Sequence, residues 1–222
     1  MLTSYGTNNI IVMVFIGVIM LVLGIKIDTK IISILLIILS VVLFFFTFWF
    51  FRDPDRNVPQ QALEDASIII SPADGKITEI VEEIESLYLN TNSKRITIFL
   101  SPLDVHVNRI PISGVVEFYH YNAGQYIIAS HPKASELNEQ SRIGLQTKYG
   151  KILFKQIVGI VARRLVCELK VGDTVNVGAR FGMMKFGSRM DIALPLDAEV
   201  LVNVGDRVVA AETIIAKLKK EN

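Results

Sequence analysis

The sequence predicts a mainly β protein: a barrel- or sandwich-like β core of short strands with a few short helices, preceded by an N-terminal hydrophobic helical hairpin. Three observations lead to this fold class. Two long uncharged runs stand near the N-terminus. From Ser67 onward, short segments alternate polar and apolar residues, as half-buried strands do. Gly, Pro, Asn and Asp separate these segments at close spacing, which is typical of sandwiches and barrels.

The two apolar runs have lengths near that of a membrane span. Residues 10–25 and 31–51 carry no charged side chain. As helices they are about 24 Å and about 31 Å long, and the hydrocarbon core is about 30 Å thick. A signal peptide is disfavoured, because the first run lacks a basic segment before it and an Ala-x-Ala-like site after it. A buried core helix is disfavoured because no polar face is present. We therefore expect a membrane-associated hairpin over residues 1–51.

The charges beside these runs leave the orientation open. Lys26 and Lys30 lie between the runs, and Arg52 and Arg56 follow the second one, so the positive-inside count ties. Cys167 is the only cysteine, which rules out an internal disulfide and fits a reducing compartment. We expect a cell-membrane protein whose remaining domain faces the cytoplasm.

The chain after the hairpin divides into a linker over residues 52–66 and one domain over residues 67–222. Prolines and charges in the linker argue against regular structure there. The domain is long enough to bury its own core. We expect strands at 67–71, 76–81, 95–99, 114–118, 151–156, 161–169, 190–194, 199–202 and 213–218, and a helical turn at 134–142.

Two segments of the domain resemble each other. LKVGDTV (169–175) and VNVGDRV (202–208) each read as a strand, a Gly-Asp turn and a second strand. This echo predicts two related β-hairpins packed around a common core. Swinging-arm carrier domains share the V-G-D-x-V pattern, so a non-enzymatic, membrane-tethered carrier-like β-domain is an alternative function.

Composition argues against several other functions. The formal net charge is +1, which is too balanced for nucleic-acid binding. The three histidines have no metal-ligand spacing, and with one cysteine we expect no metal site. No phosphate-binding loop or dinucleotide fingerprint is present.

The residues able to carry chemistry are few. Asp104 and His106 are two apart, so they share a face of an extended strand. Asp74 lies in a turn, and Ser188 supplies a hydroxyl after Gly187. A carboxylate, an imidazole and a hydroxyl are what an activated serine needs. By spacing alone, a structural histidine and two ordinary turns explain these residues better than a catalytic site does.

Five motifs in fixed order change this weighting: FFRDPDR (50–56), SPADGK (71–76), SPLDVHVNRIP (101–111), KASELNEQSR (133–142) and FGSRMD (186–191). With these five motifs taken together, the sequence resembles the phosphatidylserine decarboxylase family in the short form shared by bacteria and archaea. The resemblance implies that the chain cuts its own Gly187-Ser188 bond into chains 1–187 and 188–222, which stay associated. Ser188 then becomes a covalent pyruvoyl cofactor, which forms a Schiff base with the serine headgroup of a membrane phospholipid and releases carbon dioxide.

The resemblance also implies roles for single residues. His106 matches the family's general acid/base, and Asp74 matches an aspartate that orients or polarises it, whereas Asp104 is a weaker, structural candidate. Arg109 stands where long-form members have a second histidine, so His106 is expected to serve both self-cleavage and decarboxylation. Arg109 then binds the substrate phosphate or carboxylate, or forms an ion pair. His131 lines the headgroup pocket or lies solvated in a loop.

Some alternatives stay open at this point. A carrier domain needs an exposed modified lysine, for which Met184-Lys185-Phe186 is a loose match. A serine hydrolase needs a G-x-S-x-G elbow, whose frame residues 187–191 lack. The sequence does not choose between phosphatidylserine, which would become phosphatidylethanolamine, and archaetidylserine. It also leaves a homo-oligomer open.

Overall fold

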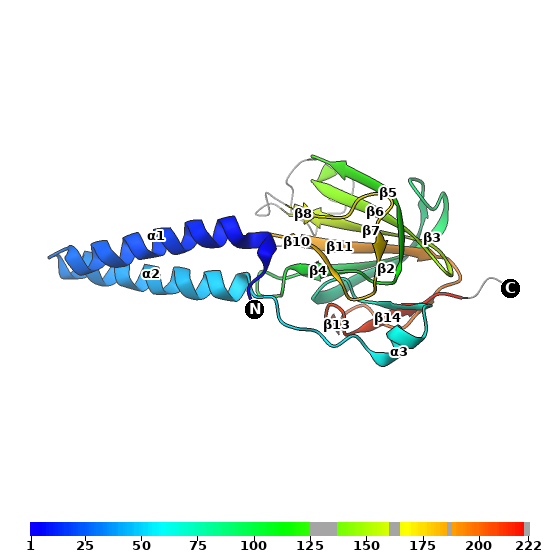
Figure 1. Ribbon diagram of the computed structural model, residues 1–222, viewed down its shortest axis with the longest axis horizontal. Helices are drawn as coiled ribbons and strands as arrows, with labels where there is room; N and C mark the ends of the chain where they lie inside the picture. Colours follow the sequence, from blue (N-terminus) through cyan, green and yellow to red (C-terminus); the bar gives the residue numbers. More distant parts are fainter. Residues whose placement is uncertain (125–136, 160–164, 186–187, 220–222) are drawn as a thin grey trace. The chain divides into compact units, whose positions relative to one another are not determined.

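The structure, a computed structural model, describes residues 1–124, 137–159, 165–185 and 188–219 (Figure 1). Contacts divide the chain into two compact units, Met1–Asp55 and Arg56–Asn222. The predicted helical hairpin and mainly β core are both confirmed.

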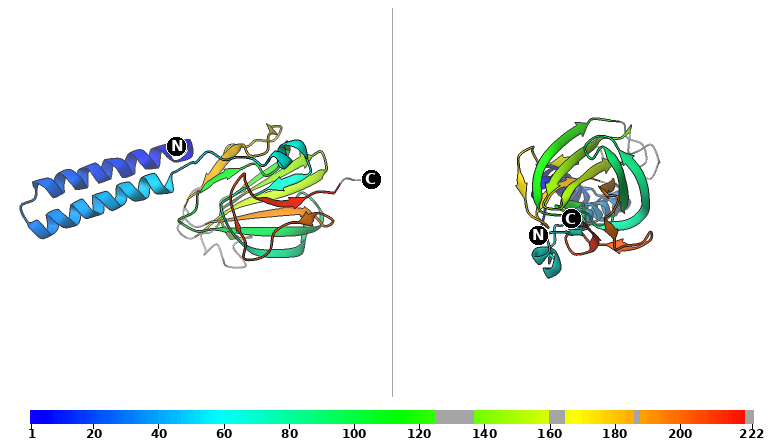
Figure 2. Two further views of the ribbon diagram at one scale, coloured as in Figure 1. Left: turned by 90° about the horizontal axis from the view of Figure 1, so that it is seen from below. Right: turned by 90° about the vertical axis from the view of Figure 1, so that its right-hand side faces the viewer.

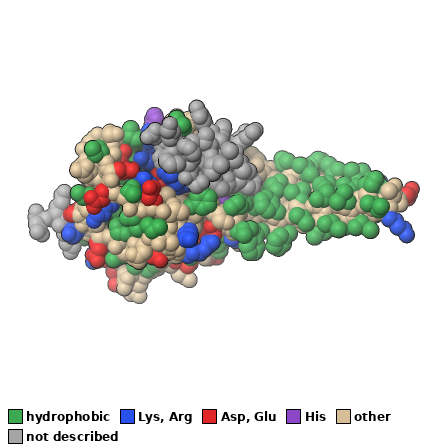
Figure 3. All heavy atoms as spheres, turned by 180° about the vertical axis from the view of Figure 1, so that it is seen from behind, with side chains coloured by type: hydrophobic (Ala, Val, Ile, Leu, Met, Phe, Trp, Pro, Cys, Tyr) green, Lys and Arg blue, Asp and Glu red, His purple; other side chains and the backbone are tan. Residues whose placement is uncertain are grey.

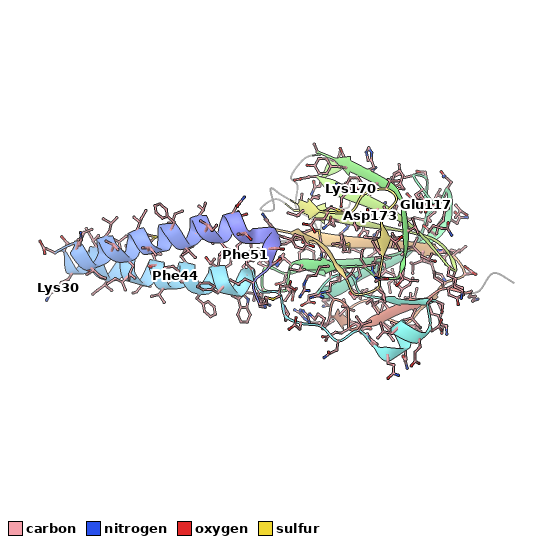
Figure 4. The ribbon with its side chains drawn as sticks, in the orientation of Figure 1. Lys30, Phe44, Phe51, Glu117, Lys170 and Asp173 are labelled. Atoms are coloured by element: carbon pink, nitrogen blue, oxygen red, sulfur yellow. The ribbon has the colours of Figure 1, made fainter. Side chains whose placement is uncertain are left out.

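The first unit is a helical hairpin. It contains the 3-10 helix η1 (Ser4–Gly6) and the helices α1 (Thr7–Lys26) and α2 (Lys30–Phe50). Hydroxyls of α2 bond to backbone carbonyls of α1: Ser40 Oγ donates to Gly17 O at 2.8 Å, and Ser33 Oγ donates to Gly24 O at 2.6 Å. The ring of Phe44, labelled in Figure 4, fills the space beside Gly17. Small residues on one helix therefore let the two helices pack closely.

Both helices present apolar side chains outward. Figure 3 shows an almost continuous hydrophobic surface along the hairpin, with charges gathered at its loop. Two helices, Ser4–Lys26 and Lys30–Phe50, are long and apolar enough to cross a membrane. A surface of this kind matches lipid better than water.

The second unit begins with a short helix in the predicted linker. Helix α3 (Gln60–Glu64) buries Ala62 against Ile68 and Ala211. The expectation of no regular structure in the linker is wrong at α3, because its five residues include no Gly or Pro and gain a buried apolar contact.

The described residues after α3 contain fourteen strands: β1 (Ile68–Ile70), β2 (Gly75–Glu85), β3 (Thr91–Leu100), β4 (Val107–Arg109), β5 (Gly114–Asn122), β6 (Gln140–Thr147), β7 (Gly150–Val158), β8 (Leu165–Cys167), β9 (Thr174–Val175), β10 (Arg180–Met184), β11 (Ser188–Pro195), β12 (Glu199–Val200), β13 (Arg207–Val208) and β14 (Ile214–Lys217). The helical turn expected at 134–142 is wrong for residues 140–142, which lie in β6. The start of that range lies outside the described residues.

Eight of these strands form one curled sheet, in the order β13-β2-β3-β11-β7-β6-β5-β9. The right-hand view of Figure 2 shows how strongly it curls. The orders β4-β10-β8 and β1-β14-β12 form two smaller sheets. Strand β11 lies in the middle of the large sheet, paired with β3 on one side and β7 on the other.

The hydrophobic core lies against one face of the large sheet, here called the core face. Phe154 on β7 meets Phe181 on β10 edge to face, with ring centroids 5.3 Å apart. Met190 and Ile192 of β11 belong to the same buried cluster. Because side chains alternate along a strand, Ser188 points to this same core face.

The opposite face of the large sheet carries buried charges. Arg189 Nη2 lies 2.8 Å from Asp191 Oδ2, and both side chains are less than a tenth exposed. Thr97 Oγ1 donates to Asp191 Oδ1 at 3.0 Å. Lys155 on β7 is the backbone register partner of Asp191 on β11. Burial lowers the pKa of Lys155, although nearby Asp191 acts in the opposite direction.

The two V-G-D segments form the same turn. Lys170 N donates to Asp173 Oδ2 at 2.8 Å, and Asn203 N donates to Asp206 Oδ2 at 2.7 Å. Figure 4 labels Lys170 and Asp173 of the first turn. In both turns the glycine before the aspartate has a positive φ. The expected β-hairpins are wrong, because the strands on the two sides of each turn pair with other strands: β8 with β10 and β9 with β5, and β12 with β14 and β13 with β2. What the two segments share is the turn itself.

The backbone hydrogen bonds that the two turn regions make to earlier parts of the chain also correspond to each other. Gly205 N donates to Ile77 O and Gly172 N donates to Val116 O, each at 2.8 Å; Ala211 N donates to Ser71 O and Gly178 N donates to Ile110 O, each at 2.9 Å. Strands β13 and β9, which follow the two turns, are the two edges of the large sheet. The domain therefore contains an approximate internal two-fold repeat.

Candidate active site

Ser188 is the first residue of the central strand β11. It pairs with Leu100 on β3 and with Val158 on β7, and its side chain is completely buried. Its Oγ has no hydrogen-bond partner among the described parts of the chain. A buried polar group without a partner costs about 1–3 kcal/mol. Such a hydroxyl is rare in a folded protein unless it has a chemical use.

His106 lies directly before β4, and its side chain is also completely buried. Its Nδ1 is 2.9 Å from Asp104 O. A carbonyl oxygen only accepts hydrogen bonds, so the neutral ring carries its proton on Nδ1 and has an acceptor lone pair at Nε2. This is the tautomer that a general base acting through Nε2 requires. Met184 N, at the end of β10, donates to His106 O at 3.2 Å.

Strand register places His106 toward the end of the sheet where Ser188 lies. Asn108 is two residues after His106 on the same face, and it accepts a hydrogen bond from Gln156 on β7. On β7, Val158 is two residues beyond Gln156 and pairs with Ser188. The imidazole and the hydroxyl therefore approach one end of the core from facing sheets.

Three buried polar side chains, those of Ser141, Gln156 and Asn108, form a hydrogen-bonded chain near the site. Sequence reasoning missed them. Ser141 Oγ donates to Gln156 Oε1 at 2.6 Å, and Gln156 Nε2 donates to Asn108 Oδ1 at 2.9 Å. All three side chains are completely buried. The signal in the sequence was Asn108 itself, because strand alternation puts it on the same face as His106.

Asp74 lies at the start of β2, at the same end of the large sheet. Its Oδ2 accepts from Arg56 Nη2 at 2.7 Å, and its Oδ1 accepts from Ala210 N at 2.8 Å. The internal repeat supplies a counterpart, because Val177 N donates to Ser113 Oγ at 2.9 Å. The carboxylate of Asp74 therefore holds its turn in place.

Asp104 has a structural environment. Its Oδ2 accepts from Ser101 N at 2.7 Å, and its Oδ1 accepts from Arg207 Nη1 at 2.9 Å. The side chain closes the loop that carries His106. Asp104 and His106 are thus linked through the backbone carbonyl of Asp104.

Comparison with known proteins decides the family. A family model described as "Phosphatidylserine decarboxylase" matches residues 43–216. The phosphatidylserine decarboxylase proenzyme of Salinibacter ruber is 52% identical over 174 residues, which cover 78% of this chain and 76% of the relative. That of Chlorobium chlorochromatii is 42% identical over 217 residues, covering 98% of this chain and 100% of the relative. The chain belongs to the phosphatidylserine decarboxylase family.

A third relative extends the comparison to another lineage. The phosphatidylserine decarboxylase proenzyme of Carboxydothermus hydrogenoformans is 45% identical over 178 residues, which cover 80% of this chain and 82% of the relative. The family predicted from five ordered motifs is therefore confirmed. As a member of the phosphatidylserine decarboxylase family, the chain is an enzyme.

Of the two predicted substrate-binding residues, the structure describes only Arg109. Arg109, on β4, is 6% exposed, and its Nη1 donates to Gly178 O at 3.3 Å. His131 lies outside the described residues. Strand alternation puts Arg109 on the opposite side of β4 from His106 and Asn108.

Local geometry weakens both rival functions. A carrier lysine must be exposed for modification, whereas Lys185 is only 7% exposed. The nucleophile of a serine hydrolase leads into a helix, whereas Ser188 opens a strand. Within the described residues, no three His, Cys, Asp or Glu side chains form a group that could hold a metal ion.

Proposed function

We propose that the chain decarboxylates the serine headgroup of a phospholipid, with a pyruvoyl group that it makes from its own Ser188. One observation carries the proposal: Ser188 Oγ is buried without a described partner. The tautomer of His106, whose Nδ1 meets Asp104 O, leaves its Nε2 able to accept a proton. Family membership supports the reaction class. Relatives named proenzymes support self-processing.

Self-cleavage uses residues of this chain alone. His106 Nε2 takes the proton of Ser188 Oγ, and Oγ attacks the carbonyl carbon of Gly187. The amide nitrogen leaves that carbon and becomes protonated, so that an ester joins Gly187 to Ser188. Loss of the Ser188 α-proton then breaks the Cβ–Oγ bond, and Gly187 departs as a carboxylate that contains Oγ. Water replaces the nitrogen on the remaining unsaturated residue, and ammonia is released.

The site fits a group of this kind. A buried, apolar surrounding formed by Leu100, Val158 and Met190 excludes water from the carbonyl. The pyruvoyl group supplies an electron-accepting carbonyl for loss of carbon dioxide from an amine-bearing substrate. His106 then donates a proton to the product through the same Nε2 that served in self-cleavage.

The two proposed chains stay together without a covalent bond. Residues 188–222 contain β11, which hydrogen-bonds to β3 and β7 on both of its edges. They also contain β13, paired with β2, and β14, paired with β1. The small chain is thus held by four strands of the large one: β1, β2, β3 and β7.

Three further residues receive roles in this proposal. Asp74 is a positioning residue that keeps the turn before β2 in place beside the site. Arg109 and His131 are proposed to contact the phosphate or carboxylate of the substrate. For Arg109, this requires the guanidinium to reach around β4 from its bond to Gly178 O.

We further propose that the apolar hairpin anchors the enzyme in the cell membrane with the catalytic domain on the cytoplasmic face. Two apolar helices of spanning length support the anchor. Arg52 lies 4.2 Å from the ring centroid of Trp49, a pair suited to a membrane–water interface. Deleting residues 1–50 is expected to preserve self-cleavage and to lower turnover of lipid in vesicles. Equal turnover on vesicles would refute the anchor.

Intact-mass measurement tests the central proposal. Wild-type protein is expected to yield two chains, and the smaller one should be lighter by one ammonia than residues 188–222 with an intact serine. Ser188→Ala protein should stay uncut and inactive, and His106→Ala protein should not decarboxylate phosphatidylserine vesicles. A single wild-type species at 24.8 kDa would overturn the proposal and favour the carrier-like alternative.

A further inference from the structure

We propose that Asn108 is a catalytic residue of self-cleavage, whose Nδ2 donates a hydrogen bond to Ser188 Oγ while that oxygen carries negative charge. This inference rests on the self-cleavage proposed above. It concerns two side chains that are completely buried and that share one end of the core.

The hydrogen-bond network fixes the orientation of the Asn108 amide. Val166 O can only accept, so the Gln156 atom 3.2 Å from it must be the amide nitrogen. Ser141 Oγ occupies the other end of the Gln156 amide, at Oε1. The second hydrogen of Gln156 Nε2 then meets Asn108, which must present its oxygen there. Both N–H groups of Asn108 consequently point away from Gln156.

These N–H groups have no hydrogen-bond partner among the residues that the structure describes. Native structures rarely bury such donors without a use for them. From Gln156, the next residue of β7 on the core face in the direction away from Ser188 is Phe154. Its ring packs against Phe181 and offers the Asn108 amide no acceptor. Toward the end of the sheet lies Ser188, whose Oγ is also without a described partner. The hydroxyl is thus the acceptor that fits the orphaned donor.

The proposed hydrogen bond requires only a rotation about the Ser188 Cα–Cβ bond. The hydroxyl makes no such bond in the continuous chain, but three staggered positions are open to Oγ about this bond. One short polar side chain moves, while Ser141 and Gln156 hold Asn108 still. The donor is therefore preorganised, which is the condition for effective stabilisation of charge.

Negative charge develops on Ser188 Oγ at two steps of the proposed cleavage. It appears first when His106 removes the hydroxyl proton, and again when the Cβ–Oγ bond breaks and the electron pair leaves on the Gly187 carboxylate. A neutral amide donor assists both steps without exchanging a proton. It therefore does not compete with His106 for the acid/base role.

Three substitutions of Asn108 in the full chain, held in detergent, test the inference. Asn108→Leu fills a similar volume without a donor, and we expect cleavage about 100-fold slower, as for loss of one preorganised donor elsewhere. Asn108→Ser keeps a donor and should cleave at an intermediate rate. Asn108→Asp places a second anion beside Oγ; its rate relative to wild type should recover as pH falls and the carboxyl regains a proton to donate.

Two controls separate chemistry from folding. Ile152→Ala removes a buried side chain of β7 far from Ser188 and should lower the melting temperature without slowing cleavage comparably. Gln156→Met releases the Asn108 amide and should slow cleavage, with no added effect in Asn108→Leu protein.

The outcomes are distinguishable. An uncut wild-type chain would defeat the proposed function itself. A wild-type chain that cuts, beside Asn108→Leu protein that cuts at the same rate, would overturn only the role of Asn108. The same holds if Asn108→Asp shows no recovery at low pH, or if the effects of Asn108→Leu and Gln156→Met simply add.

Discussion

The backbone amide of Ala210 donates a hydrogen bond to Asp74 Oδ1 at 2.8 Å. The bond joins residues that lie on opposite sides of the proposed cleavage position. Its counterpart in the internal repeat, from Val177 N to Ser113 Oγ, needs only a hydroxyl. Asp74 differs from Ser113 in carrying a negative charge, and it forms an ion pair with Arg56, whose Nη2 lies 2.7 Å from Asp74 Oδ2.

Asp74→Asn and Asp74→Ala therefore differ in their expected effects. Asparagine keeps an acceptor for Ala210 N and loses the ion pair with Arg56, whereas alanine leaves a buried amide unpaired, at a loss of about 1–3 kcal/mol in the free energy of unfolding. Urea titration measures this difference. If Asp74→Asn protein cuts itself normally but fails to decarboxylate at all, Asp74 acts on the chemistry directly rather than by positioning the turn.

Asp191→Ala should be among the most damaging substitutions in the large sheet. It leaves the buried guanidinium of Arg189 without its carboxylate, and breaking a buried pair in this way costs about 3–5 kcal/mol. Glu79→Ala is the matched control, because Glu79 pairs with Arg95 at 2.7 Å but is 47% exposed, and its loss should cost under about 1 kcal/mol. Equal losses of unfolding free energy would contradict this account.

Lys155→Met should stabilise the domain at neutral pH. Burial lowers the pKa of Lys155 in the folded state, so the unfolded chain binds this proton more tightly, and wild-type stability rises as pH passes from the lowered folded pKa toward about 10.4. A gain of about 1 kcal/mol corresponds to about 2–4 °C in melting temperature. The gain should shrink as pH approaches that upper value; a constant difference across pH would show that packing, not charge, is responsible.

The two proposed chains should remain one particle after cleavage. Strand β11 bonds to neighbours on both edges, and β13 and β14 pair with other strands of the large chain. Size-exclusion chromatography in detergent is expected to show co-elution, and separation only in denaturant. Release of residues 188–222 under native conditions would contradict the central placement of β11.

Much of the fold followed from local pattern. Alternation located β2, β3 and β5, because half-buried strands impose a period of two on their own residues. The equivalence of the turns at Asp173 and Asp206 was also local, since each aspartate caps an amide three residues earlier. The order of strands was not readable, because pairing β11 between β3 and β7 joins segments far apart in sequence.

The site divides in the same way. Ser188 and His106 came from motifs. Asn108 was missed, although strand alternation puts it on the same face as His106. The contact from Gln156 to Asn108 spans 48 residues, so no local pattern reports it. The partners of Asp74 were equally hidden, because Ala210 lies 136 residues away and its amide belongs to every residue type except proline.

The central position of β11 also bears on when the enzyme can become active. Only a chain that has placed this strand between β3 and β7 buries Ser188 in the core. Under the proposed self-cleavage, misfolded molecules would not form the pyruvoyl group, so the yield of the small chain would measure the fraction of molecules that folded correctly.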